Sequence, residues 1–395
     1  MAIATLADLL HPVTPEAFFA EYYDRKPLHV PGGAAKFAEV MSWRILSDLL
    51  NMNAIWSAAS LNLVIDRQPV PAEQFCAPAV DRDGRSALRP VAERVGALLR
   101  QGATLVANDI DSLTPALKSV ARLLEEGIGG KAQANLYCSR RERQAFHSHF
   151  DFHDVFAVHV EGEKTWNVYE RRVEHPINHP QFHWTRERHE AERGPVMMQV
   201  PMKPGDLLYL PRGWYHDALA TTDGCIHIAF GLTTPIGLDA VTALFDELVA
   251  DHAFRRPPPR ALQEGDAAAA GPWLDGLAER VAAALRSPAA AARIAHMVAG
   301  YRYPRGGFDL PADAVVPVYR LAGAFQVVRE GGAWKLKGSR GAVPVPPGLE
   351  GPIGWIVERG RFSDADFAAA HPALGEAARR RLYADLAGMK VLQGD

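Results

Sequence analysis

The stretch GDLLYLPRGWYH, which runs from Gly205 to His216, combines a turn, a short apolar strand and a bend. Its first two residues predict the turn, and the four apolar residues that follow predict the strand. Pro211 and Gly213 end the strand, because proline donates no backbone hydrogen bond and glycine accepts a sharp bend. The bend then directs His216 back toward the strand. The stretch therefore predicts antiparallel β-structure that carries a histidine at its open end.

A second stretch, FHSHFDFHDVF from Phe146 to Phe156, alternates polar and apolar residues as a β-strand does. In an extended strand, residues two positions apart lie on the same face. Three imidazoles and one carboxylate then share a face: His147, His149, His153 and Asp151. Buried imidazoles and carboxylates need polar partners, and a divalent metal ion is one such partner. A single histidine of this kind is more often an ordinary surface or core residue, so the metal interpretation depends on the first stretch as well.

The overall composition is that of a soluble globular protein. The chain has 395 residues, of which 48% are hydrophobic and 23% charged, and a formal net charge of −3. This charge does not favour direct nucleic-acid binding. Cys76, Cys138 and Cys225 are odd in number and widely spaced, which predicts reduced thiols and a cytoplasmic location. We expect no signal peptide and no membrane association, because no apolar run approaches the roughly 20 residues that span a bilayer.

The chain is expected to contain four segments. Residues 1–130 mix helices and strands, and residues 131–236 form a core of short strands separated by turns. A helical region at 237–305 includes LDAVTALFDELVADHAF, which predicts one amphipathic helix. Residues 306–395 again mix strands and helices, as a small winged-helix module or a plain packing domain would.

The two signature stretches lie 65 residues apart, counted from Asp151 to His216 (216 − 151 = 65). Further residues follow the first stretch in a recognisable order: Asp154-Val155-Phe156, Glu161-Gly162, Lys164 and Trp166. Together these features resemble the JmjC-type, cupin-fold 2-oxoglutarate oxygenases, and within them the ribosomal oxygenase branch, which hydroxylates ribosomal proteins. The resemblance extends over about residues 10–235 and is weak beyond.

The resemblance implies an α+β fold built on a double-stranded β-helix, the cupin or JmjC jelly-roll barrel. A helical N-terminal flank, a helical dimerisation region and a C-terminal winged-helix-like domain would surround this barrel. The chain is then expected to be a homodimer.

The resemblance also implies a set of site residues. His149, Asp151 and His216 would bind Fe(II) as a two-histidine, one-carboxylate set that leaves three coordination positions open. Lys164, with Asn135 and Tyr137, would bind 2-oxoglutarate as cosubstrate. The reaction would consume O2, and no residue is expected to act as a catalytic acid or base.

The predicted function is hydroxylation of an arginine or histidine side chain of a protein or peptide substrate, possibly a ribosomal protein. The polar stretch from Arg171 to Gly194 is expected to lie near the active site, and Trp184, Trp214 and Tyr215 are candidate wall residues. A peptide or amino-acid natural product is an alternative substrate for the same chemistry.

Two further alternatives stay open at this point. His147, His149 and Asp154 match the first stretch of cupin enzymes that bind metal without 2-oxoglutarate, with aspartate in place of glutamate. A cupin without catalytic activity, acting as a binding module, is the other alternative. The positions of Lys164 and Trp166 agree only with the His149 and Asp151 interpretation.

Overall fold

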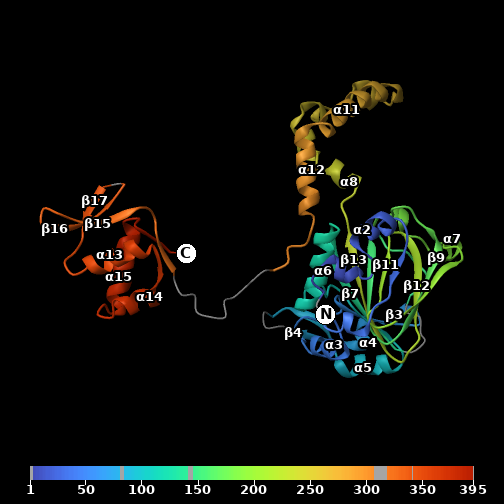
Figure 1. Cartoon of the computed structure of the whole chain (residues 1–395). Helices are drawn as coiled ribbons and strands as arrows, with labels where there is room; N and C mark the ends of the chain where they lie inside the picture. Colours follow the sequence, from blue (N-terminus) through green and yellow to red (C-terminus); the bar gives the residue numbers. More distant parts are fainter. Residues whose placement is uncertain (1–2, 81–83, 141–145, 307–317, 340, 395) are drawn as a thin grey trace. The chain divides into compact units, whose positions relative to one another are not determined.

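A computed structural model describes residues 3–80, 84–140, 146–306, 318–339 and 341–394 (Figure 1). The chain divides into two compact units, Met1–Arg305 and Gly306–Asp395, which are described separately. No helix among the described residues is long and apolar enough to cross a membrane.

The first unit is built on an antiparallel sheet of eight strands. Their spatial order is β1-β11-β8-β13-β7-β6-β2-β3. The bounds are β1 Leu28–Val30, β2 Leu61–Ile65, β3 Gln68–Pro69, β6 Thr104–Ala107, β7 Lys131–Ser139, β8 Asp154–Glu161, β11 Leu207–Leu210 and β13 Cys225–Thr233. β8 is buried along almost its whole length, as expected for a strand covered on both faces.

A second antiparallel sheet of three strands lies opposite this large sheet and completes the barrel. Its order is β10-β9-β12, with bounds β9 Lys164–Arg172, β10 Val196–Met202 and β12 Trp214–Ala220. Alternate side chains of the two sheets meet in one buried cluster: Val155, Ala157, Trp166, Val168, Val200, Met202, Leu208 and Leu210. The two sheets therefore pack face to face, as in a double-stranded β-helix.

Helices and a hairpin from the N-terminal part surround the large sheet. They are α1 Leu6–Leu10, α2 Pro15–Ala17, the π-helix η1 Phe18–Tyr22, η2 Ala34–Lys36, α3 Trp43–Leu50, α4 Ala72–Phe75, β4 Cys76–Val80, β5 Ser86–Pro90, α5 Ala92–Arg100 and α6 Pro115–Gly127. α6 lies beside β7 and β13 (Figure 1). Leu117, Val120 and Leu124 of α6 pack into the same core as Leu136 and Ile228 of the sheet.

Two further regions leave the barrel. The connection between β9 and β10 contains η3 Pro180–Phe182 and α7 Arg186–Glu192. After β13 come α8 Gly237–Thr242, α9 Phe245–Ala250, η4 His252–Arg255, α10 Arg260–Gln263, η5 Ala267–Ala269, α11 Ala270–Leu285 and α12 Pro288–Gly300. The single helix predicted for residues 238–254 is therefore wrong. A turn at Ala243 and Leu244 separates α8 from α9, and the side chain of Leu244 is completely buried at this turn.

The second unit has its own small core. It contains β14 Val318–Leu321, β15 Phe325–Glu330, β16 Ala333–Gly338, β17 Gly341–Pro344, α13 Glu350–Arg359, β18 Arg361–Ser363, α14 Asp364–Ala370, α15 Glu376–Gly388 and β19 Leu392–Gly394. Two three-stranded sheets, β18-β14-β19 and β15-β16-β17, accompany the three helices. The winged-helix assignment of this part and the four segment boundaries stay predictions.

The barrel interior holds two imidazoles that the fold keeps neutral. Burial lowers the pKa of His159 to about 4. Burial and the nearby charge of Lys164 lower the pKa of His227 well below its ordinary value. Both side chains are almost inaccessible to solvent.

These imidazoles predict a barrel that loses stability in mild acid. In the unfolded chain these imidazoles take up protons near pH 6.5, whereas in the folded chain they do not. Their full contribution to the free energy of unfolding is therefore present above that pH, and it falls as the pH drops toward 4. The slope should reach about 1.4 kcal/mol per pH unit for each imidazole. His159→Gln should reduce the slope in urea unfolding experiments between about pH 6.5 and 5. The exposed His296→Gln should keep it, and equal slopes for both variants would contradict the assignment.

Candidate functional site

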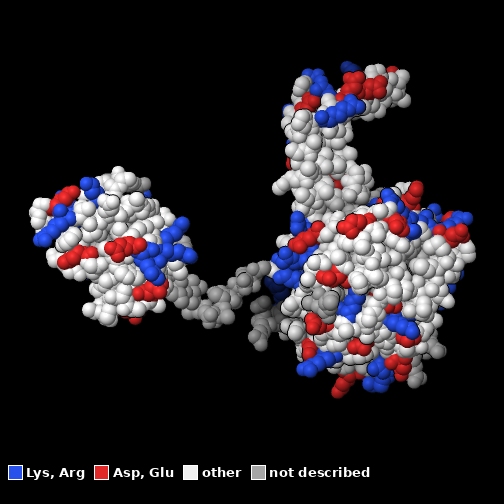
Figure 2. Space-filling view, in the orientation of Figure 1, with Lys and Arg blue, Asp and Glu red and all other residues white. Residues whose placement is uncertain are grey.

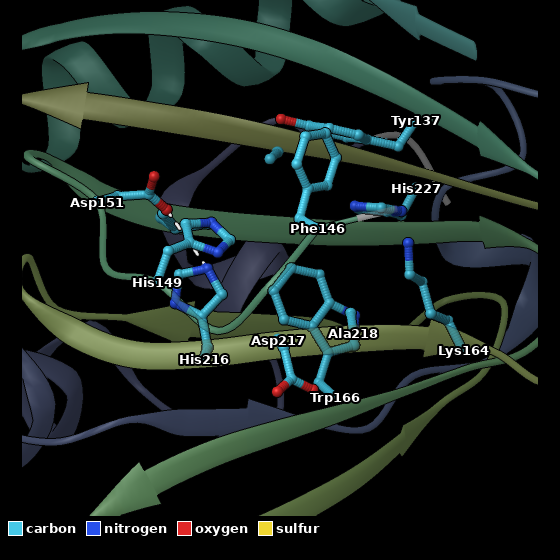
Figure 3. A pocket seen from close by; sticks show the side chains of 12 residues that line it. Tyr137, Phe146, His149, Asp151, Lys164, Trp166, His216, Asp217, Ala218 and His227 are labelled. Carbon is cyan, nitrogen blue, oxygen red and sulfur yellow. Dashed lines mark ion pairs between the residues drawn. The ribbon is translucent and has the colours of Figure 1, made fainter. Parts of the chain in front are cut away.

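Two imidazoles and one carboxylate converge at one end of a cavity inside the barrel (Figure 3). The ligand atoms of His149, Asp151 and His216, called the triad below, all lie within 4.8 Å of one another. His216 Nε2 is 3.4 Å from Asp151 Oδ2. The structure thus brings together the three residues that the two signature stretches single out.

The triad is assembled by one backbone bridge rather than by a full strand. His149 N donates to His216 O at 3.0 Å, and His216 N donates to His149 O at 2.8 Å. The strand predicted across residues 147–153 is wrong, because β8 begins only at Asp154. Residues of this segment instead bind the bend before His216: Gly213 N donates to Asp151 O, and Arg212 N donates to an Asp154 carboxylate oxygen.

The bend itself requires glycine. Gly213 has a φ of 87°, a conformation that other residues rarely adopt. A Cβ atom at this position would lie 1.9 Å from the carbonyl oxygen of Val173. The sharp turn predicted from Pro211 and Gly213 is therefore present, and it presents His216 to His149.

Hydrogen bonds to the backbone select the tautomer of both histidines. His149 Nδ1 lies 2.8 Å from the carbonyl oxygen of His147, and His216 Nδ1 lies 2.9 Å from that of Trp214. A carbonyl can only accept, so each Nδ1 must carry the proton. Nε2 of each ring is then left with a free lone pair, as a metal ligand needs.

The electrostatics of the site favour a neutral His216 beside an ionised Asp151. Burial and the neighbouring His149 lower the pKa of His216 to about 4. Burial alone would raise the pKa of Asp151, but the imidazoles of His153, His216 and His149 outweigh burial and lower it. At neutral pH His216 and Asp151 therefore have the protonation state of metal ligands.

The other histidines of the first stretch lie elsewhere. His147 Nδ1 faces Glu190 at 4.0 Å, and the ring of His153 packs on Gly231. The carboxylate of Asp154 accepts the Arg212 N–H at 2.8 Å instead of facing the triad. The three-residue set His147, His149 and Asp154 is therefore not brought together, which removes the structural basis of the rival metal site.

The cavity beside the triad has a volume of about 100 Å³. Its lining residues are Tyr137, Phe146, His149, Asp151, Val155, Lys164, Trp166, His216, Asp217, Ala218, His227 and Ala229. Figure 3 shows the triad at one end and Lys164 at the other, with aromatic side chains between them. Trp184, Trp214 and Tyr215 do not line it, so their expected role as wall residues is wrong.

Lys164 is a buried cation at the inner end of the cavity. It is 5% exposed, and burial lowers its pKa below the ordinary value. Across the part of the chain that the structure describes, its ammonium group forms no ion pair. An unpaired buried ammonium is costly, so the cavity is suited to a ligand that brings a negative charge.

The two other predicted pocket residues differ in their positions. Tyr137 lines the cavity, and its ring stacks on His227 at 4.8 Å with 7° between the planes. Asn135 does not line the cavity. It hydrogen-bonds to Tyr137, and its carbonyl oxygen accepts the backbone N–H of Asp109 at 3.2 Å.

Sequence reasoning did not assign His227, Trp166 or Phe146 to the pocket wall. The Nδ1 of His227 and the Nε1 of Trp166 are buried without a hydrogen-bond partner among the described residues. The alternation of CIHIAFGL could have indicated that His227 points into the barrel, because its neighbours Ile226 and Ile228 point the other way into the main core.

Known proteins share this fold and part of this sequence. The JmjC domain family matches residues 113–239. The chain is 28% identical over 229 residues to the bifunctional lysine-specific demethylase and histidyl-hydroxylase NO66 of Drosophila persimilis, which is 57% of this chain and 31% of that protein. It is 26% identical over 226 residues to ribosomal oxygenase 1 of Gallus gallus, 56% of this chain and 35% of that protein. The chain thus spans about a third of the length of these relatives.

A solved structure has the same arrangement of elements. YcfD, a ribosomal oxygenase from Escherichia coli in complex with cobalt and succinic acid, aligns with a TM-score of 0.50 and 15% identity. The alignment covers 97% of this chain and 99% of that one. At this identity the similarity concerns the fold. The predicted double-stranded β-helix is confirmed, and residues 113–239 match the JmjC domain family.

Proposed function

We propose that the protein is an Fe(II)- and 2-oxoglutarate-dependent oxygenase that hydroxylates an arginine or histidine side chain of a protein such as a ribosomal protein. One observation carries the proposal. A triad of two imidazoles and one carboxylate shares a cavity with a buried ammonium that has no acidic partner among the described residues. This combination suits a metal ion and a dicarboxylic acid bound side by side.

The donor set favours Fe(II). Two histidines and one carboxylate on one side of the ion leave three positions open, as in non-haem iron oxygenases. His149 and Asp151 would bind from one of the two bridged segments and His216 from the other. The Nδ1–H groups of both histidines would keep their rings oriented.

Lys164 would bind the distal carboxylate of 2-oxoglutarate. The ammonium is a strong donor in a dry environment, and Tyr137 adds a hydroxyl group from β7 of the large sheet, opposite the sheet that carries Lys164. Asn135 would act through its hydrogen bond to Tyr137. The aromatic walls exclude water, while O2 activation and C–H oxidation are the chemistry that the iron and the 2-oxo acid supply when bound.

The mouth of the cavity suits a flat, cationic or imidazole side chain. Phe146 is exposed beside Tyr137, with 5.9 Å between their ring centres. Aromatic faces attract guanidinium and imidazolium groups. The names of the relatives, histidyl-hydroxylase and ribosomal oxygenase, support the same substrate class. A peptide or amino-acid natural product is the second candidate, and O2-dependent release of succinate without protein hydroxylation would favour it.

We also propose that the protein is a homodimer formed through the helical region. Large apolar side chains are exposed there: Leu238 (61%), Val241 (47%) and Phe245 (66%), with Val249, Leu274, Leu285 and Val298. Figure 2 shows few charged side chains over α12. Extended apolar surfaces of this kind mark protein interfaces, and two-fold dimers are the commonest oligomers.

The first prediction concerns the activity. Incubation with Fe(II), 2-oxoglutarate and candidate ribosomal proteins should release succinate and add the mass of one oxygen atom to one protein. Asp151→Ala should reduce both by more than about 100-fold, because even the outer partners of metal ligands are worth 10–100-fold. His147→Ala should retain activity, since its side chain lies outside the triad. An equal loss of activity in both variants would instead favour the rival metal site of His147, His149 and Asp154.

The second prediction concerns Lys164. Lys164→Met should raise the KM for 2-oxoglutarate about 10- to 100-fold, because a charge-assisted hydrogen bond contributes about 1.5–3 kcal/mol. Metal affinity should stay nearly unchanged, and the apoprotein should not become less stable, because the substitution removes an unpaired buried charge. Lys203→Met, an exposed control, should change neither. An unaltered KM in Lys164→Met would remove Lys164 from the cosubstrate site.

The third prediction concerns the dimer. Light scattering at micromolar concentration should give twice the mass of one chain, and the Leu238→Glu, Phe245→Glu double variant should give a single-chain mass. The exposed Ile55→Glu on the N-terminal flank should leave the mass unchanged. A single-chain mass for the wild-type protein would refute the proposal.

A further inference from the structure

Aromatic residues alternate with the triad along the chain. Phe150 lies between His149 and Asp151, and Tyr215 directly precedes His216. Both rings are buried, with 6% and 1% exposure, and they pack edge to face at 5.3 Å between ring centres. Neither lines the cavity, so the two rings join the triad-bearing segments from outside the site.

Two residues of the connection between β9 and β10 complete this cluster. The ring of His189 lies 5.1 Å from Phe150 and 5.7 Å from Tyr215. The ring of Trp184 lies 5.5 Å from Phe150 and 6.0 Å from His189. These four rings, Phe150, Tyr215, Trp184 and His189, are called the aromatic clamp below.

The outer half of the clamp is held by its own local contacts. Trp184 Nε1 donates to the carbonyl oxygen of Gln181 at 2.9 Å, and the Arg188 guanidinium lies 3.6 Å from the Trp184 ring centre. The Thr185 hydroxyl caps the N-terminus of α7, which carries His189. Trp184 and His189 are therefore ordered before any ligand binds.

Phe150 and Tyr215, the inner half of the clamp, lie on the two chain segments that carry the triad. These segments need support from packing, because few hydrogen bonds join them. Outside the clamp, the bridge between His149 and His216 and the Gly213 N–H bond to Asp151 O are their backbone links. A metal site works only when its ligands are held to within about 0.5 Å. Packing on Phe150 and Tyr215 fixes the backbone from which His149, Asp151 and His216 project.

The clamp is not simply an apolar core. The Tyr215 hydroxyl and His189 Nδ1 are buried without hydrogen-bond partners among the described residues. An unpaired buried polar atom costs free energy, so an aliphatic cluster would be more stable. The cluster keeps these two polar rings despite the free energy that their unpaired atoms cost. This agrees with a role in positioning the residues of the triad.

We propose that Trp184 and His189 are positioning residues, which act through Phe150 and Tyr215 to set the separation of His149 and Asp151 from His216. The inference rests on the proposed metal site. It assigns to the connection between β9 and β10 a role in metal affinity, in addition to any contact with the substrate.

The test is anaerobic titration of the apoprotein with Co(II), followed by visible absorption. Trp184→Ala should raise the Kd for Co(II) by about 10-fold or more, the range for the outer partners of metal ligands. Trp184→Phe should recover most of the affinity, because it keeps a ring at the same place. Phe182→Ala is the matched control, since its ring lies in the same connection but makes no contact with the clamp among the described residues.

A second pair of variants separates positioning from folding. Trp184→Leu keeps an apolar but smaller side chain, and the melting temperature of the apoprotein measures what the lost packing costs in stability. The Co(II) affinity and spectrum should still change at temperatures well below that melting temperature. Tyr215→Phe keeps the ring and removes only the unpaired hydroxyl, so Co(II) affinity should be retained. Wild-type affinity and spectrum in both Trp184→Ala and Trp184→Leu would overturn the clamp while the metal site stands. Failure of the wild-type protein to bind Co(II) would overturn the metal site itself, and the clamp with it.

Discussion

The pair of backbone hydrogen bonds between His149 and His216 is the interaction on which the site depends. It joins the segment before β8 to β12, two parts of the chain that the sequence separates by more than sixty residues. The bend at Gly213 makes the bridge geometrically accessible, and the hydrogen bonds of Arg212 and Gly213 to the first segment hold it in place. The barrel thus acts as a frame that holds the two triad-bearing segments together.

Burial then determines the chemistry of the groups that the frame brings together. Low polarity keeps His216, His159 and His227 neutral and leaves Lys164 as a cation that lacks an acidic partner within the described segments. The cavity therefore contains groups that attract ions of opposite charge, because the triad attracts a cation and Lys164 attracts an anion. A metal ion and a dicarboxylic acid bound together would satisfy both, which explains why the pocket has this arrangement of charges.

The sequence predicts the parts of this arrangement that depend on local chemistry. His149, Asp151 and His216 could be named from the turn residues and the spacing of the two signature stretches, and Lys164 from the resemblance to the JmjC-type oxygenases. The parts that depend on packing could not be predicted. Period-two alternation suggested a strand through His153, whereas polar contacts with the bend replace that strand. Trp184 resembled a wall residue, but only tertiary contacts show that it packs behind the site.

The most direct test of the account is an anomalous diffraction map of crystals loaded with a divalent transition metal. The account predicts a single strong peak in contact with Nε2 of His149, a carboxylate oxygen of Asp151 and Nε2 of His216. A peak coordinated by His147 and Asp154, or no peak near the triad under conditions in which the protein is folded, would contradict it.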